Sequence, residues 1–199
     1  MKKSNAPIVP RSAIVDPAGG DGAREYHELW FALAGRDWRS VVFVPADPED
    51  SAAPAAAALA SVGRQLHNYP IILYTMAKPA DYWPAMEMLN AAATAAGAPV
   101  IPVETEPMNY ASAVQVVAEA AARPNESRSE SSKVIVAIQP VVSEPLGLAI
   151  TQAADAVVLC LRAGWTSQAS VRRTIELIGR HRIAGCVLDS SRRPARSKR

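Results

Sequence analysis

Residues 41–60 read VVFVPADPEDSAAPAAAALA, and they decide how the rest of the chain is interpreted. The stretch predicts a buried strand, a short loop and a helix. In a chain of alternating strands and helices, the first such unit commonly holds a phosphate-binding loop, in which glycine N–H groups and a lysine meet the phosphate charge. This loop lacks both residue types and carries Asp47, Glu49 and Asp50 instead. Because carboxylates repel phosphate, the unit has the architecture of a nucleotide enzyme without its nucleotide chemistry.

The composition is that of an ordinary globular domain. The chain has 199 residues, of which 49% are hydrophobic and 20% charged, which suits one domain with a proper core. No apolar run reaches the ~18 residues of a membrane span, and the basic N-terminus lacks the apolar segment of a secretory signal. We therefore expect a cytoplasmic protein. Cys160 and Cys186 lie in apolar runs and are expected to be buried thiols. The three histidines form no ligand cluster, so neither a metal nor another cofactor is expected.

The net charge of +2 is distributed unevenly. Residues 192–199 (RRPARSKR) contain five basic residues and no acidic one, and the remainder holds 16 basic and 19 acidic residues, a net charge of −3. We interpret residues 191–199 as a basic, disordered tail with Arg192, Arg193 and Arg196 as candidate partner contacts. The tail either contacts an anionic membrane surface or only keeps the protein soluble. Since the body is acidic, no nucleic-acid partner is expected.

Alternating strands and helices predict an α/β fold with a mainly parallel sheet and helices on both faces. The strands are expected at residues 41–44, 71–74, 100–103, 134–138, 156–161 and 185–188. The helices are expected at residues 23–34, 53–66, 81–96, 110–122, 146–154 and 167–181. Most of the strand runs are unbroken rather than alternating, which is typical of strands covered on both faces. Residues 1–22 lack sustained periodicity and are interpreted as a flexible arm, so the domain spans residues 23–190.

Three of the predicted helices carry an apolar stripe with helical spacing. The stripes consist of Tyr26, Trp30 and Leu33 in the first helix, Leu59, Val62 and Leu66 in the second, and Val171, Ile175 and Ile178 in the last. Trp30 either packs in the core or anchors a partner, and the sequence favours neither. Trp165 falls in a loop and is the better candidate for an exposed anchor.

Ligands in such folds bind beyond the carboxyl ends of the strands. Among the polar side chains expected at this edge, Lys78 is either a displaced phosphate-binding lysine or a solvated loop residue. Arg162 and Thr166 flank Gly164 at the end of a strand. They either contact a residual ligand or only shape the loop.

Five segments carry recognisable patterns in a consistent order. Residues 134–141 (VIVAIQPV) are similar to V-I-I-D-T-P-P-V, residues 153–166 (AADAVVLCLRAGWT) to A-D-G-V-L-L-V-V-R-A-G-x-T, and residues 183–189 (IAGCVLD) to I-x-G-V-V-L-N. Residues 24–33 and 42–60 match the helix, strand and loop that precede these patterns. The order resembles that of the bacterial tyrosine kinases of the CpsD/CapB type, in the MinD/ParA-like deviant P-loop superfamily. The resemblance implies a P-loop NTPase-like fold, and these kinases work with membrane-embedded co-polymerases in capsule and exopolysaccharide export.

The resemblance also locates what this chain lacks. It places the phosphate-binding lysine at Ala52, the Mg²⁺-binding serine or threonine at Ala53, and the aspartate of the D-T-P-P motif at Ala137. Phosphoryl transfer depends almost entirely on positioning and on charge neutralisation by that lysine and the metal ion. We therefore expect no kinase or ATPase activity.

We thus expect a catalytically inactive, tyrosine-kinase-like accessory protein in exopolysaccharide or capsule synthesis or export. It would bind a membrane co-polymerase or a kinase partner through Trp30, Trp165 and the basic tail, as a peripheral protein at the inner face of the membrane. Two alternatives stay open: an enzyme or nucleotide-binding regulator with a repurposed site, and a MinD/ParA-like positioning factor. The family's oligomer-forming motif E-x-x-R-x-x-R falls on Arg24, His27 and Trp30, so the family's ring is not expected and the oligomeric state stays open.

Overall fold

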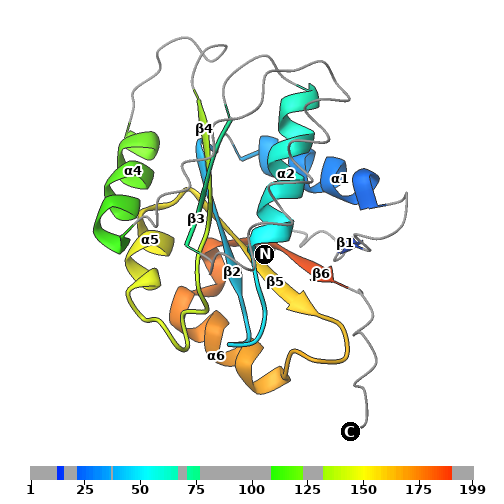
Figure 1. Ribbon diagram of the computed structural model, residues 1–199, viewed down its shortest axis with the longest axis vertical. Coiled ribbons are helices and arrows are strands. Elements are labelled where there is room, and N and C mark those ends of the chain that lie inside the picture. Colours follow the sequence, from blue (N-terminus) through cyan, green and yellow to red (C-terminus); the bar gives the residue numbers. More distant parts are fainter. Residues whose placement is uncertain are drawn as a thin grey trace, which may run out of the picture.

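The computed structural model describes residues 13–15, 22–36, 38–66, 71–76, 109–122 and 132–189. Within these ranges the chain forms a parallel sheet with helices on both faces (Figure 1). The strands are β1 (Ala13–Val15), β2 (Ser40–Pro45), β3 (Ile71–Thr75), β4 (Lys133–Ala137), β5 (Ala156–Arg162) and β6 (Ile183–Asp189). Their order across the sheet is β1-β6-β5-β2-β4-β3, and every neighbouring pair is parallel. The predicted fold class is therefore confirmed.

Two groups of helices enclose the sheet and complete three layers (Figure 1). The described helices are α1 (Gly22–Ala34), α2 (Ala53–Leu66), α4 (Tyr110–Ala122), α5 (Gly147–Ala153), α6 (Gln168–Ile178) and the 3₁₀ turn η1 (Arg180–Arg182). Side chains of α1 and α2 pack on one face of the strands, and those of α4, α5 and α6 pack on the other. Alternate residues of a strand point to opposite faces, so Val41 and Phe43 of β2 join the first cluster while Val42 and Val44 join the second.

β2 lies inside the sheet, between β5 and β4. Val42 is therefore in register with Val157 on one side and Val136 on the other. All six residues of β2 are buried. A strand with neighbours on both edges and helices on both faces requires apolar side chains at consecutive positions, which explains why an unbroken run predicts it.

The stripe predicted on the first helix lies in the core. Tyr26, Trp30 and Leu33 are 6%, 1% and 1% exposed. The ring of Trp30 meets Trp38 edge-on, with centroids 5.3 Å apart and planes at 79°, a favourable aromatic geometry. The interpretation of Trp30 as a partner anchor is therefore wrong, because the side chain is enclosed between α1, α2 and the sheet.

Gly63 of α2 allows this burial of Trp30. A β-carbon at Gly63 would lie 2.3 Å from the Trp30 ring and 2.3 Å from Cδ1 of Ile71. Glycine in a helix interior is unfavourable by about 1 kcal/mol relative to alanine. Its presence in α2 is explained by the close approach of the indole, since any side chain would overlap it.

The stripe predicted on the last helix is partly wrong. In α6, Thr174 and Ile178 are buried, whereas Val171 and Ile175 are only half-buried. The hydroxyl of Thr174 donates a hydrogen bond of 3.4 Å to the carbonyl oxygen of Ala46, just after β2. This polar contact lies on the side of α6 that faces the sheet, and a pattern of apolar residues does not reveal it. In α2, Leu66 ends the helix and is 38% exposed.

The first strand also differs from expectation. The sequence indicates no strand within the N-terminal arm, but β1 pairs in parallel with Val187–Asp189 of β6. A three-residue strand is too short to show periodicity, and its partner lies near the opposite end of the chain. The helix predicted at residues 81–96 and the strand predicted at residues 100–103 lie outside the described residues. None of the described helices is long and apolar enough to cross a membrane.

Candidate functional site

The loop between β2 and α2 lies at the carboxyl edge of the sheet, where ligands bind in folds of this kind. At its start, the N–H of Ala46 donates to the carbonyl oxygen of Cys160 in β5 at 3.1 Å. At its end, the N–H of Ala56 donates to the carbonyl oxygen of Ala52 at 3.0 Å and closes the first turn of α2. The loop is therefore held against β5 and is continuous with a helix N-terminus.

The backbone N–H groups of this loop are used within the loop itself. The N–H of Glu49 donates to Oδ1 of Asp47 at 3.4 Å, and that of Asp50 donates to the carbonyl oxygen of Asp47 at 3.0 Å. The N–H of Ala53 donates to Oγ of Ser51 at 3.3 Å. In a phosphate-binding loop such donors point at the ligand. Here three of them already have acceptors supplied by the loop.

The three positions that the resemblance assigns to nucleotide chemistry are core methyl groups. Ala52, Ala53 and Ala137 are 2%, 2% and 1% exposed. All three belong to the cluster on the α1 and α2 side of the sheet. They contribute neither a charge nor a side-chain oxygen to the edge of the sheet.

Arg162 and Thr166 are brought together with Asp50 of the loop. Nε of Arg162 lies 3.3 Å from Oδ1 of Asp50. The hydroxyl of Thr166 donates to Oδ2 of Asp50 at 2.7 Å and accepts a hydrogen bond from the backbone N–H of Arg162 at 2.6 Å. The Asp50 side chain is 5% exposed and that of Arg162 35%. Two residues predicted as ligand contacts therefore bind a carboxylate of the chain itself.

The carboxyl group of Asp50 has a raised pKa although it is paired with an arginine. Burial is the largest effect and raises the pKa of Asp50 above its ordinary value of 3.8. The nearby charges of Asp47 and Asp189 raise this pKa further, while the Thr166 hydrogen bond and the Arg162 charge lower it. The net shift is upward, because removing a carboxylate from water outweighs one partly exposed ion pair.

A small pocket of about 40 Å³ opens beside this ion pair. Its walls include the three charged residues Asp50, Arg162 and Asp189, together with Tyr26 and Cys160. Since one water needs about 10–15 Å³ of such space, the pocket has room for about three water molecules. Burial raises the pKa of the Tyr26 phenol and of the Cys160 thiol, so both are neutral near pH 7.

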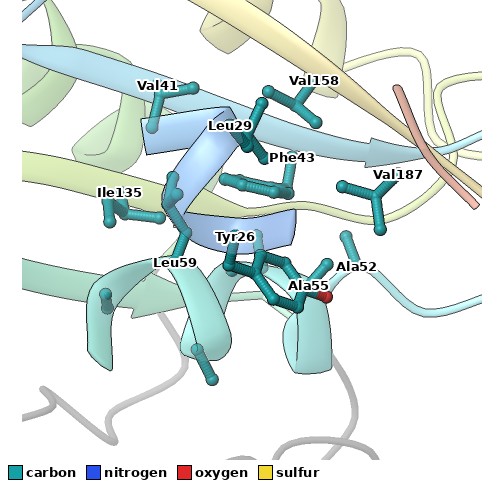
Figure 2. Packing of buried hydrophobic residues seen from close by; sticks show 14 of the residues in the cluster. Tyr26, Leu29, Val41, Phe43, Ala52, Ala55, Leu59, Ile135, Val158 and Val187 are labelled. Carbon is teal, nitrogen blue, oxygen red and sulfur yellow. The ribbon is translucent and has the colours of Figure 1, made fainter. Parts of the chain in front are cut away.

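The apolar wall of the pocket comes from α1, α2 and β6. Figure 2 shows Tyr26 of α1 beside Ala55 of α2, with Ala52 and Val187 close to them. Tyr26, Ala55 and Val187 also line the pocket. Across the described ranges, no group of three or more His, Cys, Asp or Glu side chains could hold a metal ion.

The remaining predicted contacts fall in different places. Trp165, in the turn between β5 and α6, is 42% exposed. Lys78 lies outside the described residues, as do the arginines of the tail, Arg192, Arg193 and Arg196.

Sequence reasoning missed the pairing of Asp50 with Arg162 and the contribution of Asp189 and Tyr26 to the pocket. Asp50 and Thr166 are 116 positions apart. The only sequence signal is that each charge follows or ends a predicted strand. That signal becomes useful only when β2 and β5 are known to be neighbours.

The three-layer sheet with a loop and helix after a central strand defines a P-loop NTPase-like α/β domain. Among solved structures, the chain is similar to the kinase domain of VpsO, with a TM-score of 0.59 and 16% identity over 85% of this chain and 94% of that one. It is similar to the kinase domain of the Escherichia coli tyrosine kinase ETK, with a TM-score of 0.59 and 14% identity over 89% and 80% of the two chains. The BceF tyrosine kinase domain gives a TM-score of 0.53 and 15% identity over 85% and 76%.

At these identities the likeness establishes the fold. No protein-family model matches the chain, and no curated protein matches it. The chain therefore has the fold of these tyrosine kinase domains.

Proposed function

We propose that this protein is a catalytically inactive relative of the CpsD/CapB-type tyrosine kinases that acts by binding a partner protein. The observation that carries the proposal is the burial of Ala52, Ala53 and Ala137 as core methyl groups at 2%, 2% and 1% exposure. Phosphoryl transfer needs a lysine and a metal ion to neutralise the triphosphate. Methyl groups at these positions supply neither a charge nor a metal ligand.

The charge of the loop supports the same conclusion. Two of the three charged residues in the pocket wall, Asp50 and Asp189, are acidic, and the third, Arg162, is ion-paired with Asp50. Asp47 stands in the same loop. A triphosphate at this edge would meet carboxylates and N–H groups that already have acceptors, so its negative charge would be poorly offset.

The proposed partner is a membrane co-polymerase of exopolysaccharide or capsule export, or an active kinase subunit of the same system. Trp165 is a suitable anchor because it is large, aromatic and 42% exposed. The basic tail with Arg192, Arg193 and Arg196 would add contact with the anionic inner face of the membrane. Trp30, enclosed in the core, is no longer part of this proposal.

Titration calorimetry with ATP and Mg²⁺ tests the inactive-site half of the proposal. We expect no heat of binding at nucleotide concentrations up to about 1 mM, the upper end of ordinary enzyme KM values. Micromolar binding of ATP would overturn the inactive-site proposal if it depends on the loop. The two test variants are Ser51→Phe, at the pocket wall, which should then abolish binding, and Ser112→Phe, on the exposed face of α4, which should then keep it. Both replacements add the same ring, one at the loop and one far from it. Because Ser51→Phe also removes the acceptor of the Ala53 N–H, urea denaturation must show that this variant is folded.

Binding to a co-polymerase in lipid nanodiscs tests the partner half. We expect the full chain to bind, and Trp165→Ala to weaken binding by about tenfold, as loss of an aromatic anchor commonly does. Phe31→Ala is the matched control, because Phe31 is 62% exposed on α1 and has no role in the proposal. Two outcomes would contradict the partner proposal. One is an equal loss of binding in Trp165→Ala and Phe31→Ala. The other is full binding both by Trp165→Ala and by the triple alanine variant of Arg192, Arg193 and Arg196.

A further inference from the structure

The Arg162 guanidinium meets Asp50 through a single nitrogen. The Nε–Oδ1 distance is 3.3 Å, and within the described part of the chain no other ion pair or side-chain hydrogen bond involves this guanidinium. Arginine carries five N–H donors in a planar fork and binds carboxylates and phosphates most strongly through two of them. The terminal nitrogens therefore remain as donors on a side chain that is 35% exposed.

The Thr166 hydroxyl is a second donor with a fixed direction. It accepts a hydrogen bond from the backbone N–H of Arg162 at 2.6 Å and donates its one proton to Oδ2 of Asp50 at 2.7 Å. Two further backbone bonds, from Trp165 and Thr166 to the carbonyl oxygen of Arg162, close this turn at 3.1 and 3.0 Å. Gly164 adopts φ 75° within it, a conformation that glycine takes without strain. The turn holds the hydroxyl in place whether or not Asp50 is present.

We propose that Arg162 and Thr166 form an oxyanion site that Asp50 fills from within the chain, and that the site takes a phosphate-sized oxyanion when Asp50 is removed or displaced. The two carboxylate oxygens of Asp50 mark where ligand oxygens would lie, one against each donor. The adjoining pocket of about 40 Å³ adds room for the rest of the anion, and Asp189 in its wall is the remaining carboxylate that opposes binding there. The ligand class is an inorganic phosphate or sulfate, or the phosphoryl group of a larger molecule.

Asp50 controls the occupancy of this site. A carboxylate on the same chain acts as a ligand at an effective concentration of millimolar or above, so external anions compete poorly. Displacement of Asp50 would break the side-chain contacts that join the loop after β2 to the turn after β5. The oxyanion site does not depend on partner binding. Phosphate binding by a variant without Asp50 can be measured whether or not the unchanged protein binds ATP.

Phosphate titration of three variants tests the inference. Asp50→Ser removes the internal ligand, Asp47→Ser removes a carboxylate from the same loop without opening the site, and Asp50→Ser combined with Arg162→Gln removes both partners. Amide NMR signals of Ala163 and Thr166 report binding, with sodium chloride at equal ionic strength as the reference. We expect Asp50→Ser to bind inorganic phosphate at least tenfold more tightly than the unchanged protein, and the double variant to lose this gain.

Two results would overturn the inference. One is an Asp50→Ser protein that is folded and shows no phosphate-dependent shifts of these amides. The other is an equal gain in Asp47→Ser, which would indicate a general effect of reduced negative charge. If Asp50→Ser does not fold, Asp50→Ala, which also removes the internal ligand, is used in its place, with the same expected gain and the same contradicting results. Sulfate in place of phosphate should give the same pattern, because the site recognises an oxyanion rather than one element.

Discussion

The carboxylate of Asp155 holds the first residue of β2, Ser40, from a position 115 residues away. Its Oδ2 accepts hydrogen bonds of 2.9 Å from the N–H and from the hydroxyl of Ser40, and a third of 2.9 Å from the N–H of Arg39. The N–H of Asp155 donates back to the Ser40 hydroxyl at 3.1 Å. Because Ser40 is fully buried, these bonds satisfy groups that water does not reach. They align the starts of β5 and β2, and thereby set the register with which both strands reach the candidate site.

Replacing Asp155 should weaken the fold without touching that site. We expect Asp155→Ala to lower the free energy of unfolding by about 2–3 kcal/mol, since hydrogen bonds to a charged group each contribute about 1.5–3 kcal/mol and buried donors lose their acceptor. Asp155→Asn should lose less, because one carbonyl oxygen remains. Urea denaturation measures both. Glu119→Ala, which removes an exposed 2.9 Å bond from Gln115 on α4, is the control and should lose no more than about 0.5 kcal/mol.

Gly63 should not tolerate even a methyl group. In an open helix, Gly→Ala is stabilising by about 1 kcal/mol, but the added carbon would lie 2.3 Å from the Trp30 ring. We expect Gly63→Ala to be destabilising by about 1–3 kcal/mol, the usual effect of overpacking. Chemical denaturation followed by tryptophan fluorescence measures it. Gly35→Ala, whose β-carbon would meet nothing closer than 3.7 Å, is the matched control. A stabilised Gly63→Ala protein would show that α1 and α2 do not cross so closely.

Asp50 should make the stability depend on pH in a direction opposite to that of most aspartates. Its pKa is raised in the folded protein above the ordinary 3.8, so the folded state holds this proton more tightly than the unfolded state. The stabilisation is present below pH 3.8 and is lost as the pH rises through the folded pKa.

Comparison with Asp50→Asn isolates this effect. The free energy of unfolding of the unchanged protein, measured relative to Asp50→Asn by urea denaturation, should fall as the pH rises from the ordinary aspartate pKa of 3.8 through the raised pKa of the folded state. Asp47, Asp189, Glu25, Tyr26 and Cys160 are titratable groups that act on this part of the molecule. They are present in both proteins, so their own contributions largely cancel in the difference. A difference that rises with pH would mean that Arg162 outweighs burial.

The Cys160 thiol should be inert in the folded protein. It is 5% exposed and burial raises its pKa, whereas reaction with disulfide reagents requires an accessible thiolate. We expect the Cys186→Ser variant, which retains only Cys160, to react at pH 7.5 at least about 100-fold more slowly than the same chain in urea, since reaction must await an opening of the structure. The reciprocal variant Cys160→Ser retains the half-buried Cys186 and should react faster. Rapid labelling of Cys160 would mean that the pocket opens readily.

The elements could be predicted because their signals are local. α2 and α4 begin and end at the residues predicted for them, and four of the predicted strands lie within one or two residues of β2, β3, β4 and β5. The N–H of Ser112 donates to Oδ1 of Asn109 at 2.8 Å, a local side-chain cap at the start of α4. The errors lie where partners are distant: β1 pairs with β6, and the buried Thr174 of α6 contacts the carbonyl of Ala46, 128 residues away.

The sequence by itself determined the α/β fold class and the absence of a lysine and glycines in the loop after β2, because both follow from residue identities over short stretches. Only the tertiary structure decided what the remaining charges do. The order of the sheet places β5 beside β2 and so brings Arg162 and Thr166 onto Asp50. The packing of α1 on α2 places Trp30 against Gly63. Such contacts depend on which strands are neighbours and how closely two helices cross, and those relations are set by packing over the whole chain.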